Sequence, residues 1–201
     1  MKIYILRHED RTQDCSFFAP LTKIGLENSI KLVKFLEKEK IDKIYCSPFI
    51  RTLQTVYPYS KEHNVKINIE YGLSELHNEE IIARKAVGVS LPEYLAESFN
   101  YNSEYKTLIK PTDIIYPEKN KHVQIRLKRV LRKIIQDNLE SNHNIILVSH
   151  QTLCNTVLKI VNNSSKEFKG KLEESVINNY KKGKLCLIFD SENIWTYKPI
   201  N

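Results

Sequence analysis

The sequence predicts a three-layer α/β/α sandwich with a mainly parallel central sheet. Short apolar segments alternate with longer amphipathic segments along the 201 residues, a pattern typical of parallel strands joined by helices. Three of the apolar segments are each followed by a polar loop that carries serine, histidine or arginine. The length suits one domain of this kind, and we expect residues 1–201 to form it.

The first predicted strand covers residues 2–6 and runs into Arg7 and His8. A short apolar run bounded by charge is typical of a strand that is buried on both faces. The loop after such a strand lies at its carboxyl end, where open α/β sheets bind their ligands. An imidazole beside a guanidinium at that edge is suited to holding a phosphoryl group.

A helix is predicted next, over residues 24–40, with Thr22 as its N-cap. Its apolar positions, which we expect to face the core, are Leu26, Ile30, Val33 and Leu36. A second strand is predicted over 41–46. Ser47 and Pro48 then indicate an N-cap and a first-turn proline, so a second helix is expected to begin at Pro48 and to end before Asn64.

After a third predicted strand over 65–69, residues 72–121 show little periodicity. This segment holds several prolines, and we expect it to form a cap inserted over the sheet. Its aromatic residues Tyr94, Phe99 and Tyr101 are expected in the core of this cap.

The remaining elements restore the strand and helix alternation. We expect a helix over 118–139, a fourth strand over 144–148, and a further helix after Ser149 and His150. Residues 176–199 alternate in polarity, which predicts two or three antiparallel edge strands with a turn at 190–193.

The formal net charge of +7 comes from Lys and Arg spread through the chain. The densest cluster is Arg126, Lys128, Arg129, Arg132 and Lys133. Such a run most often forms a solvated helix face, and no aromatic residues are interleaved with it, so nucleic acid is an unlikely partner. The positive field favours encounter with an anionic substrate.

The four cysteines are scattered without the spacing of a zinc site, and no segment has the length and polarity of a signal peptide or a membrane span. We therefore expect a cytoplasmic protein with no membrane association and no bound metal. Cys46 and Cys154 are expected to pack as small apolar residues.

Polar residues follow three predicted strands, and in a parallel sheet these strand ends meet. The groups are Arg7 with His8, Ser47 to Arg51, and Ser149 with His150. Two guanidiniums and two imidazoles can enclose a tetrahedral dianion. His8 can then attack phosphorus, His150 can stabilise the transferring oxygens, and Glu75 can protonate the departing alkoxide.

Five segments, in order, resemble the histidine phosphatase superfamily, also called the phosphoglycerate mutase-like fold. They are LRHED at 6–10, PLTKIG at 20–25, IYCSPFIRTLQT at 44–55, LSE at 73–75 and LVSHQ at 147–151. The resemblance implies that His8 is the phosphorylated nucleophile, that Arg7, Arg51 and His150 bind phosphate, and that Glu75 is the proton donor. It also implies no metal and no organic cofactor.

Details of the loops favour the phosphatase branch of this family over the mutase branch. Arg7 and His8 followed by Arg11 and Asp14 are more like the protein-tyrosine and steroid-phosphate phosphatases. By this comparison Arg11 is a further substrate contact. Gln151, where the family more often has glycine, is a second candidate for substrate binding.

Several alternatives stay open. Glu9 stands where the family usually has glycine, and a carboxylate there could disable hydrolysis and leave a non-catalytic phosphate-binding or phosphoprotein-binding module. A third possible function, after the hydrolase and the binding module, is phosphotransfer of the phosphoglycerate mutase type. The substrate is either a small phosphorylated molecule or a phosphoprotein. Glu79 or Glu80 could replace Glu75 as the proton donor. Exposed strands in the tail could pair between two copies of the chain and form a homodimer. The other histidines, His63, His77, His122 and His143, are expected at the surface or in turns.

Overall fold

The computed structural model describes residues 1–83, 88–164, 180–189 and 198–199. Its core is one sheet with the strand order β3-β2-β4-β1-β5-β6. The strands are β1 (Lys2–Arg7), β2 (Lys43–Cys46), β3 (Ile67–Ile69), β4 (Asn144–Ser149), β5 (Leu185–Phe189) and β6 (Lys198–Pro199). The first four pair in parallel, whereas β5 and β6 run antiparallel at one side.

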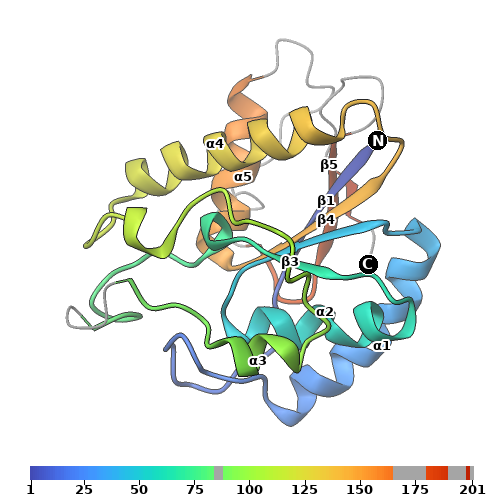
Figure 1. Cartoon of the computed structure of the whole chain (residues 1–201), viewed down its shortest axis with the longest axis horizontal. Helices are drawn as coiled ribbons and strands as arrows, with labels where there is room; N and C mark the ends of the chain where they lie inside the picture. The colour runs from blue at the N-terminus through green and yellow to red at the C-terminus, as the bar shows by residue number, and fades with distance from the viewer. Residues whose placement is uncertain (84–87, 165–179, 190–197, 200–201) are drawn as a thin grey trace.

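Helices cover both faces of this sheet. They are α1 (Lys23–Glu39), α2 (Ile50–Glu62), α3 (Glu93–Glu97), α4 (Asn120–Asn138) and α5 (Gln151–Ser164). Figure 1 shows α4 and α5 on one side of the sheet and α1 and α2 on the other. The predicted three-layer α/β/α architecture with a mainly parallel sheet is confirmed.

The central strands are apolar on both faces because each face lies under a helix pair. Ile3 and Ile5 join the core cluster that contains the buried residues of α4 and α5. Tyr4 and Leu6 join the cluster formed with α1 and α2. Successive side chains of a strand point to opposite faces, so an uninterrupted apolar run is what two covered faces require.

Helix α1 begins as predicted, because the Thr22 hydroxyl accepts a hydrogen bond from the Gly25 amide at 3.1 Å. The predicted core face is half wrong, since Leu26 and Ile30 are exposed. The first half of the helix is buried instead through Gly25 and Ser29. A Cβ atom on Gly25 would lie 2.1 Å from the Asp10 carbonyl oxygen, so the helix lies too close to that loop for a larger residue.

Helix α2 begins at Ile50 rather than at Pro48, and its N-cap residue Phe49 makes no side-chain cap bond. Ser47 is therefore not the N-cap that the sequence indicated. Its hydroxyl is shared with Nε2 of His150 at 2.8 Å, and the backbone amide that donates to it is that of the N-cap residue Phe49, at 3.5 Å, not an amide within the helix.

Between β3 and α4 the chain has little regular structure, as predicted. The buried Glu70 carboxylate accepts hydrogen bonds from the backbone of Gly72, Leu108 and Ile109. The hydroxyls of Tyr105 and Thr107 also donate to it. This one carboxylate therefore fixes the segment against the end of β3.

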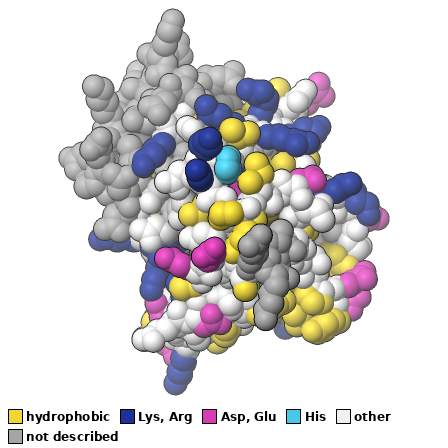
Figure 2. All heavy atoms as spheres, turned by 90° about the vertical axis from the view of Figure 1, so that its left-hand side faces the viewer, with side chains coloured by type: hydrophobic (Ala, Val, Ile, Leu, Met, Phe, Trp, Pro, Cys, Tyr) yellow, Lys and Arg dark blue, Asp and Glu magenta, His cyan; other side chains and the backbone are white. Residues whose placement is uncertain are grey.

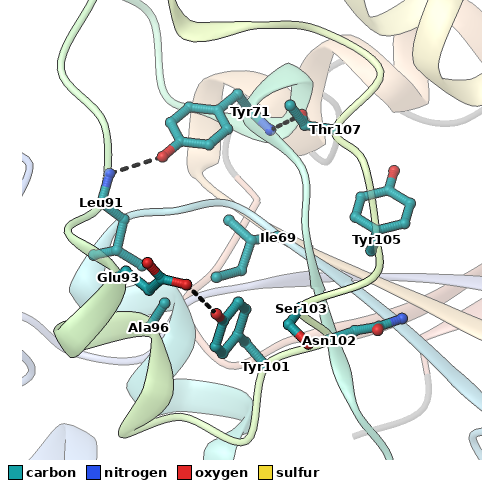
Figure 3. Close-up of a pocket in the computed structure, with 10 residues that line it drawn as sticks. All are labelled: Ile69, Tyr71, Leu91, Glu93, Ala96, Tyr101, Asn102, Ser103, Tyr105 and Thr107. Atoms are coloured by element: carbon teal, nitrogen blue, oxygen red, sulfur yellow. Dashed lines mark hydrogen bonds between the residues drawn. The ribbon is translucent and has the colours of Figure 1, made fainter.

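A cavity of about 280 Å³ lies where this segment passes β3 (Figure 3). Tyr101 donates to Glu93 at 3.3 Å, and the Tyr71 hydroxyl accepts from the Leu91 amide at 2.7 Å. Phe99 is buried as expected, but Tyr94 is 71% exposed and does not belong to a core.

The end of the chain forms the predicted antiparallel edge, with β5 paired to β1 and β6 paired to β5. The predicted turn at 190–193 lies outside the described residues. No helix in the described part of the chain combines the length and the hydropathy that crossing a membrane requires.

Candidate functional site

The carboxyl ends of β1, β2 and β4 meet as the sequence predicted. Arg7 pairs with Ser149 in the parallel ladder, and the His8 amide donates to the Ser149 carbonyl at 2.9 Å. The rings of His8 and His150 lie 5.3 Å apart, edge to face. In Figure 2, which faces the left-hand side of Figure 1, hydrophobic side chains lie between Lys or Arg side chains and Asp or Glu side chains.

His8 is held in one tautomer. Its Nδ1 lies 2.7 Å from the Glu9 carbonyl oxygen, which can only accept, so Nδ1 carries the proton. The lone pair is then on Nε2. Burial, with the positive charge of Arg51 next in size, lowers the pKa of His8 to about 3, so the imidazole is neutral in ordinary buffers. A neutral imidazole with a free lone pair is a nucleophile.

His150 is fully buried, and its Nε2 shares a hydrogen bond with the Ser47 hydroxyl. Burial and the charge of Arg51 lower the pKa of His150 well below its usual range. When the Ser47 hydroxyl donates to Nε2, the proton of the neutral ring is on Nδ1, and Nδ1 has no partner among the described residues.

Two arginines complete the group. Arg51 stacks on the Phe49 ring at 4.5 Å and donates through Nη1 to the Ser16 carbonyl at 2.8 Å. Arg7 donates through Nη1 to the Tyr180 carbonyl at 2.6 Å. Burial lowers the pKa of Arg51 to about 10, so its guanidinium is still charged at neutral pH.

The Nε atoms of Arg7 and Arg51 are buried and, like Nδ1 of His150, have no partner among the described residues. Unpaired buried donors are rare, because each costs about 1–3 kcal/mol. Three such nitrogens lie at or after the carboxyl ends of β1, β2 and β4, and two of them belong to guanidinium groups, so together they could hold an oxyanion.

Glu75 lies beside these cations, after the short 3-10 turn Tyr71–Leu73. Burial raises the pKa of its carboxyl group, although Arg51 and hydrogen bonds from the Leu76 amide and the Thr152 hydroxyl oppose this shift. A raised pKa suits a proton donor. Glu79 and Glu80 are exposed on the surface, so Glu75 is the carboxyl group that the structure brings to the arginines.

Arg126 has a position that the sequence did not predict. It is buried, not on the solvated face of α4 where Lys128, Arg129, Arg132 and Lys133 are exposed. Its guanidinium binds both carboxylate oxygens of buried Glu118 at 3.0 and 2.8 Å. It also donates to the carbonyls of Gly72 and Ser74 at 2.9 and 3.0 Å. Arg126 therefore holds the turn that carries Glu75.

His77 was expected at the surface, but it is 3% exposed and its Nε2 has no partner among the described residues. Its ring lies 6.5 Å from that of Phe49, and the His77 amide donates to Glu118 at 3.0 Å. Burial, with Arg126 next, lowers the pKa of His77 to about 4. Its proximity to Glu75 in sequence was the one signal for its position.

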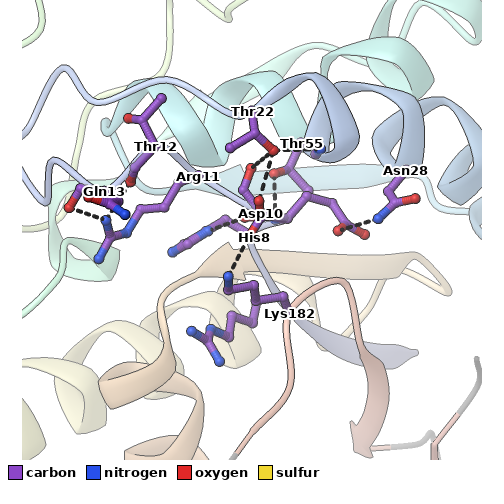
Figure 4. Close-up of polar contacts among 12 residues, drawn as sticks. His8, Asp10, Arg11, Thr12, Gln13, Thr22, Asn28, Thr55 and Lys182 are labelled. Carbon is purple, nitrogen blue, oxygen red and sulfur yellow. Dashed lines mark hydrogen bonds and ion pairs between the residues drawn. The ribbon is translucent and has the colours of Figure 1, made fainter.

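Glu9 follows His8 directly, but its carboxylate has other partners. The Asn28 amide of α1 donates to it at 3.4 Å, and the Glu9 backbone amide donates to Thr55 at 3.0 Å. A Cβ atom on Gly183 would lie 1.9 Å from Oε1 of Glu9, so the side chain extends toward that turn. In Figure 4 Asn28 lies on the other side of the loop from the His8 ring.

Arg11 and Gln151 have different surroundings. Figure 4 shows the Arg11 guanidinium turned to its own loop, where Nη1 donates to the Thr12 carbonyl at 2.7 Å and to the Gln13 carbonyl at 3.1 Å. Arg11 thereby orders the loop whose Ser16 carbonyl holds Arg51. Gln151 is the first residue of α5, directly after His150.

One group of side chains among the described residues could hold a metal ion, and it consists of Glu37, Glu62 and His63. All three are exposed at the C-terminal ends of α1 and α2. The arginine and histidine site lies at the opposite end of α2, so this group does not belong to it.

Solved structures share this fold. The ecdysone phosphate phosphatase of Bombix mori superposes with a TM-score of 0.72 at 13% identity, covering 100% of this chain and 92% of that one. The alpha-ribazole phosphatase of Shigella flexneri gives 0.64 at 19% identity, covering 100% and 96%. The phosphoglycerate mutase of Bacillus anthracis gives 0.64 at 20% identity, covering 100% and 92%.

In sequence, the chain is similar to the human ubiquitin-associated and SH3 domain-containing protein B, at 26% identity over 144 residues. The match covers 66% of this chain and 21% of that protein, so the chain spans about a fifth of the length of this relative.

The family model for the histidine phosphatase superfamily (branch 1) matches residues 6–175, which include every candidate residue of the phosphate site. The paired histidines and arginines at the strand ends, the shared fold and this match agree, and the chain belongs to the histidine phosphatase superfamily, branch 1.

Proposed function

We propose that the protein is a phosphomonoester hydrolase that forms a phosphohistidine on His8. The observation that carries the proposal is the set of unpaired nitrogens of Arg7, Arg51 and His150 around a neutral His8. We expect a phosphoryl group bound to these donors to lie against the His8 ring, whose Nε2 carries the lone pair. The cations neutralise charge on its oxygens, which is the main requirement of phosphoryl transfer.

The reaction has two steps. Nε2 of His8 bonds to phosphorus while the ester P–O bond breaks, and Glu75 gives its proton to the leaving oxygen. Water then attacks the phosphohistidine, gives a proton to Glu75, and releases phosphate with His8 restored. Hydrolysis is preferred to mutase-type transfer because the longer motif that the mutase branch has around its acid residue is not recognisable in LSELHNEE at 73–80. The proposed substrates are small phosphorylated molecules or phosphoproteins, and the proposed setting is the cytoplasm.

The test uses p-nitrophenyl phosphate and acid-labile phosphate labelling. The wild type is expected to release p-nitrophenol and to become labelled, whereas His8→Ala loses both signals. His63→Ala, which changes an exposed histidine, is the matched control and keeps both. A folded wild type that shows neither turnover nor label from acidic to neutral pH contradicts the proposal.

The second function, a phosphate-binding module disabled by Glu9, predicts that Glu9→Gly gains activity over an inert wild type. The contacts of Glu9 with Asn28 and with the turn at Gly183 favour hydrolysis instead. Equal turnover by the two proteins would remove the binding-module alternative.

A further inference from the structure

A polar cleft lies between the start of α4 and α5, next to the residues that surround Glu75. Helix α5 contributes Thr152, Asn155, Thr156 and Lys159, and α4 contributes Lys121 and Gln124. Each of the four α5 residues lies three or four positions from two of the others, so they share one face of that helix.

This cleft joins the phosphate site at Glu75. Leu76, the next residue, lines the cleft, and so does Thr152, whose hydroxyl donates a hydrogen bond to the Glu75 carboxyl group. The leaving oxygen of a substrate must lie beside the proton donor. The rest of the alcohol then extends past Glu75, and the cleft is the space that receives it.

The lining of the cleft favours a negatively charged group. Lys121 and Lys159 are exposed and come from two different helices. None of the described residues that line the cleft is acidic. Because α4 begins at Asn120, its positive helix end adds to the field of the lysines. The side-chain amides of Asn120 and Gln124, which also line the cleft, add hydrogen-bond donors for carboxylate or phosphate oxygens.

The distance along α5 indicates how long the substrate is. Lys159 follows Thr152 by seven residues, which is about 10 Å of helix rise. A charge held near Lys159 is therefore several atoms away from a phosphoryl group held by Arg7 and Arg51.

Resting on the proposed hydrolysis, we propose that the cleft binds a second anionic group on the alcohol part of the substrate. The substrate class is then a phosphomonoester of an alcohol of several carbons that also carries a carboxylate or a second phosphate. Lys121 and Lys159 are the residues that give this specificity.

The test compares two ligands with the same linear six-carbon chain. 6-Phosphogluconate carries a carboxylate at C1, whereas sorbitol 6-phosphate carries a hydroxyl there. The wild type is expected to prefer 6-phosphogluconate in kcat/KM by about tenfold, a difference of about 1.4 kcal/mol. The double variant Lys121→Ala/Lys159→Ala is expected to lose the preference, and Lys159→Glu to reverse it. The ratio within each protein cancels any general loss of activity.

Lys128→Ala, an exposed lysine of α4 that lines a different cleft, is the matched control and keeps the preference. Equal kcat/KM for the two ligands in the wild type overturns the cleft proposal while hydrolysis of p-nitrophenyl phosphate upholds the function. If p-nitrophenyl phosphate is not hydrolysed, the function fails. Calorimetry then tests the cleft through the dissociation constants of the same two ligands. The wild type is expected to bind 6-phosphogluconate about tenfold more tightly than sorbitol 6-phosphate, and the double variant is expected to lose this preference.

Discussion

Single residues next to His8 and His150 set the state of these two rings in the proposed phosphate site. The Glu9 carbonyl selects the tautomer of His8, and the Ser47 hydroxyl fixes the orientation of the His150 ring through Nε2. Both partners follow directly from the path of the chain. The Glu9 carbonyl belongs to the residue after His8, and Ser47 is the residue after β2. Groups at the ends of β1 and β2 therefore orient the two histidines.

The contact between Glu9 and Gly183 gives a prediction about stability. Gly183→Ala adds a Cβ at 1.9 Å from Oε1 of Glu9 and places alanine at a φ of +62°. The backbone conformation costs about 1 kcal/mol and the overlap about 1–3 kcal/mol more. Urea unfolding is expected to show both costs in the wild type but only the backbone cost in a Glu9→Ala background. Equal losses in the two backgrounds would mean that Glu9 does not point to this turn.

Glu75 gives a prediction about the leaving group. Glu75→Gln is expected to slow hydrolysis of β-glycerophosphate by about 100-fold and that of p-nitrophenyl phosphate much less, because nitrophenolate leaves without a proton. Since the carboxyl group must be protonated to act, wild-type turnover of β-glycerophosphate falls as pH rises through its raised pKa, and the variant lacks this decline. Glu79→Gln, an exposed neighbour, serves as control. A similar loss for both substrates would contradict the role of Glu75.

Among the elements, α4 does more than cover the sheet, because its Arg126 binds Glu118 and the turn before Glu75. Arg126 follows Val123 by three residues and precedes Val130 by four, so it shares the buried face of the helix. That spacing was available in the sequence. However, the many basic residues around Arg126 favoured a solvated helix face, and so the burial of Arg126 was not predicted.

Removing one partner of this buried ion pair is expected to be costly. Arg126→Met leaves the Glu118 carboxylate buried without its cation, which costs about 3–5 kcal/mol. In the double variant Arg126→Met/Glu118→Leu the loss is smaller than the sum of the single losses, by about 1–3 kcal/mol. Thermal or urea unfolding of the four proteins measures this coupling. Arg129→Met, an exposed arginine of the same helix, should change stability little, and additive losses would argue against the ion pair.

Across the whole molecule, buried neutral imidazoles make the fold sensitive to acid. The pKa of His8 is lowered to about 3 and that of His77 to about 4, while His150 is also lowered. Below the ordinary histidine pKa, the unfolded chain takes up protons that the folded chain does not, so stability falls as pH decreases. The raised carboxyl pKa values of Glu9 and Glu75 act in the opposite direction.

The variant His77→Gln isolates one of these groups. Between pH 7 and pH 5 the wild type is expected to lose about 2 kcal/mol more stability than the variant, because only the wild type carries the His77 contribution. Urea unfolding at several pH values in this interval measures the difference. Parallel stability curves for the two proteins would show that His77 is protonated in the folded state.

The architecture and the convergence of Arg7, His8, Arg51 and His150 could be predicted because they depend on strand order and on residues at strand ends. The start of α2, the buried half of α1 and the burial of His77 could not. Each of them is decided by a contact with a distant segment: His150 for Ser47, the Asp10 carbonyl for Gly25, and Glu118 for the His77 amide. Local periodicity carries no information about such partners.

The position of β1 between β4 and β5 has a consequence for synthesis of the protein. On the ribosome, β1 emerges before the other described strands of this sheet, and its ladder partners begin only at Asn144 and Leu185. The Arg7 guanidinium likewise gains its carbonyl partner only when Tyr180 has been made. Pairing between distant segments is slow and leaves apolar surface exposed in the meantime. The apolar residues Ile3 to Leu6 therefore stay without their strand partners until Asn144 and Leu185 have been made. A chaperone that binds the nascent β1 segment is expected to raise the yield of folded protein.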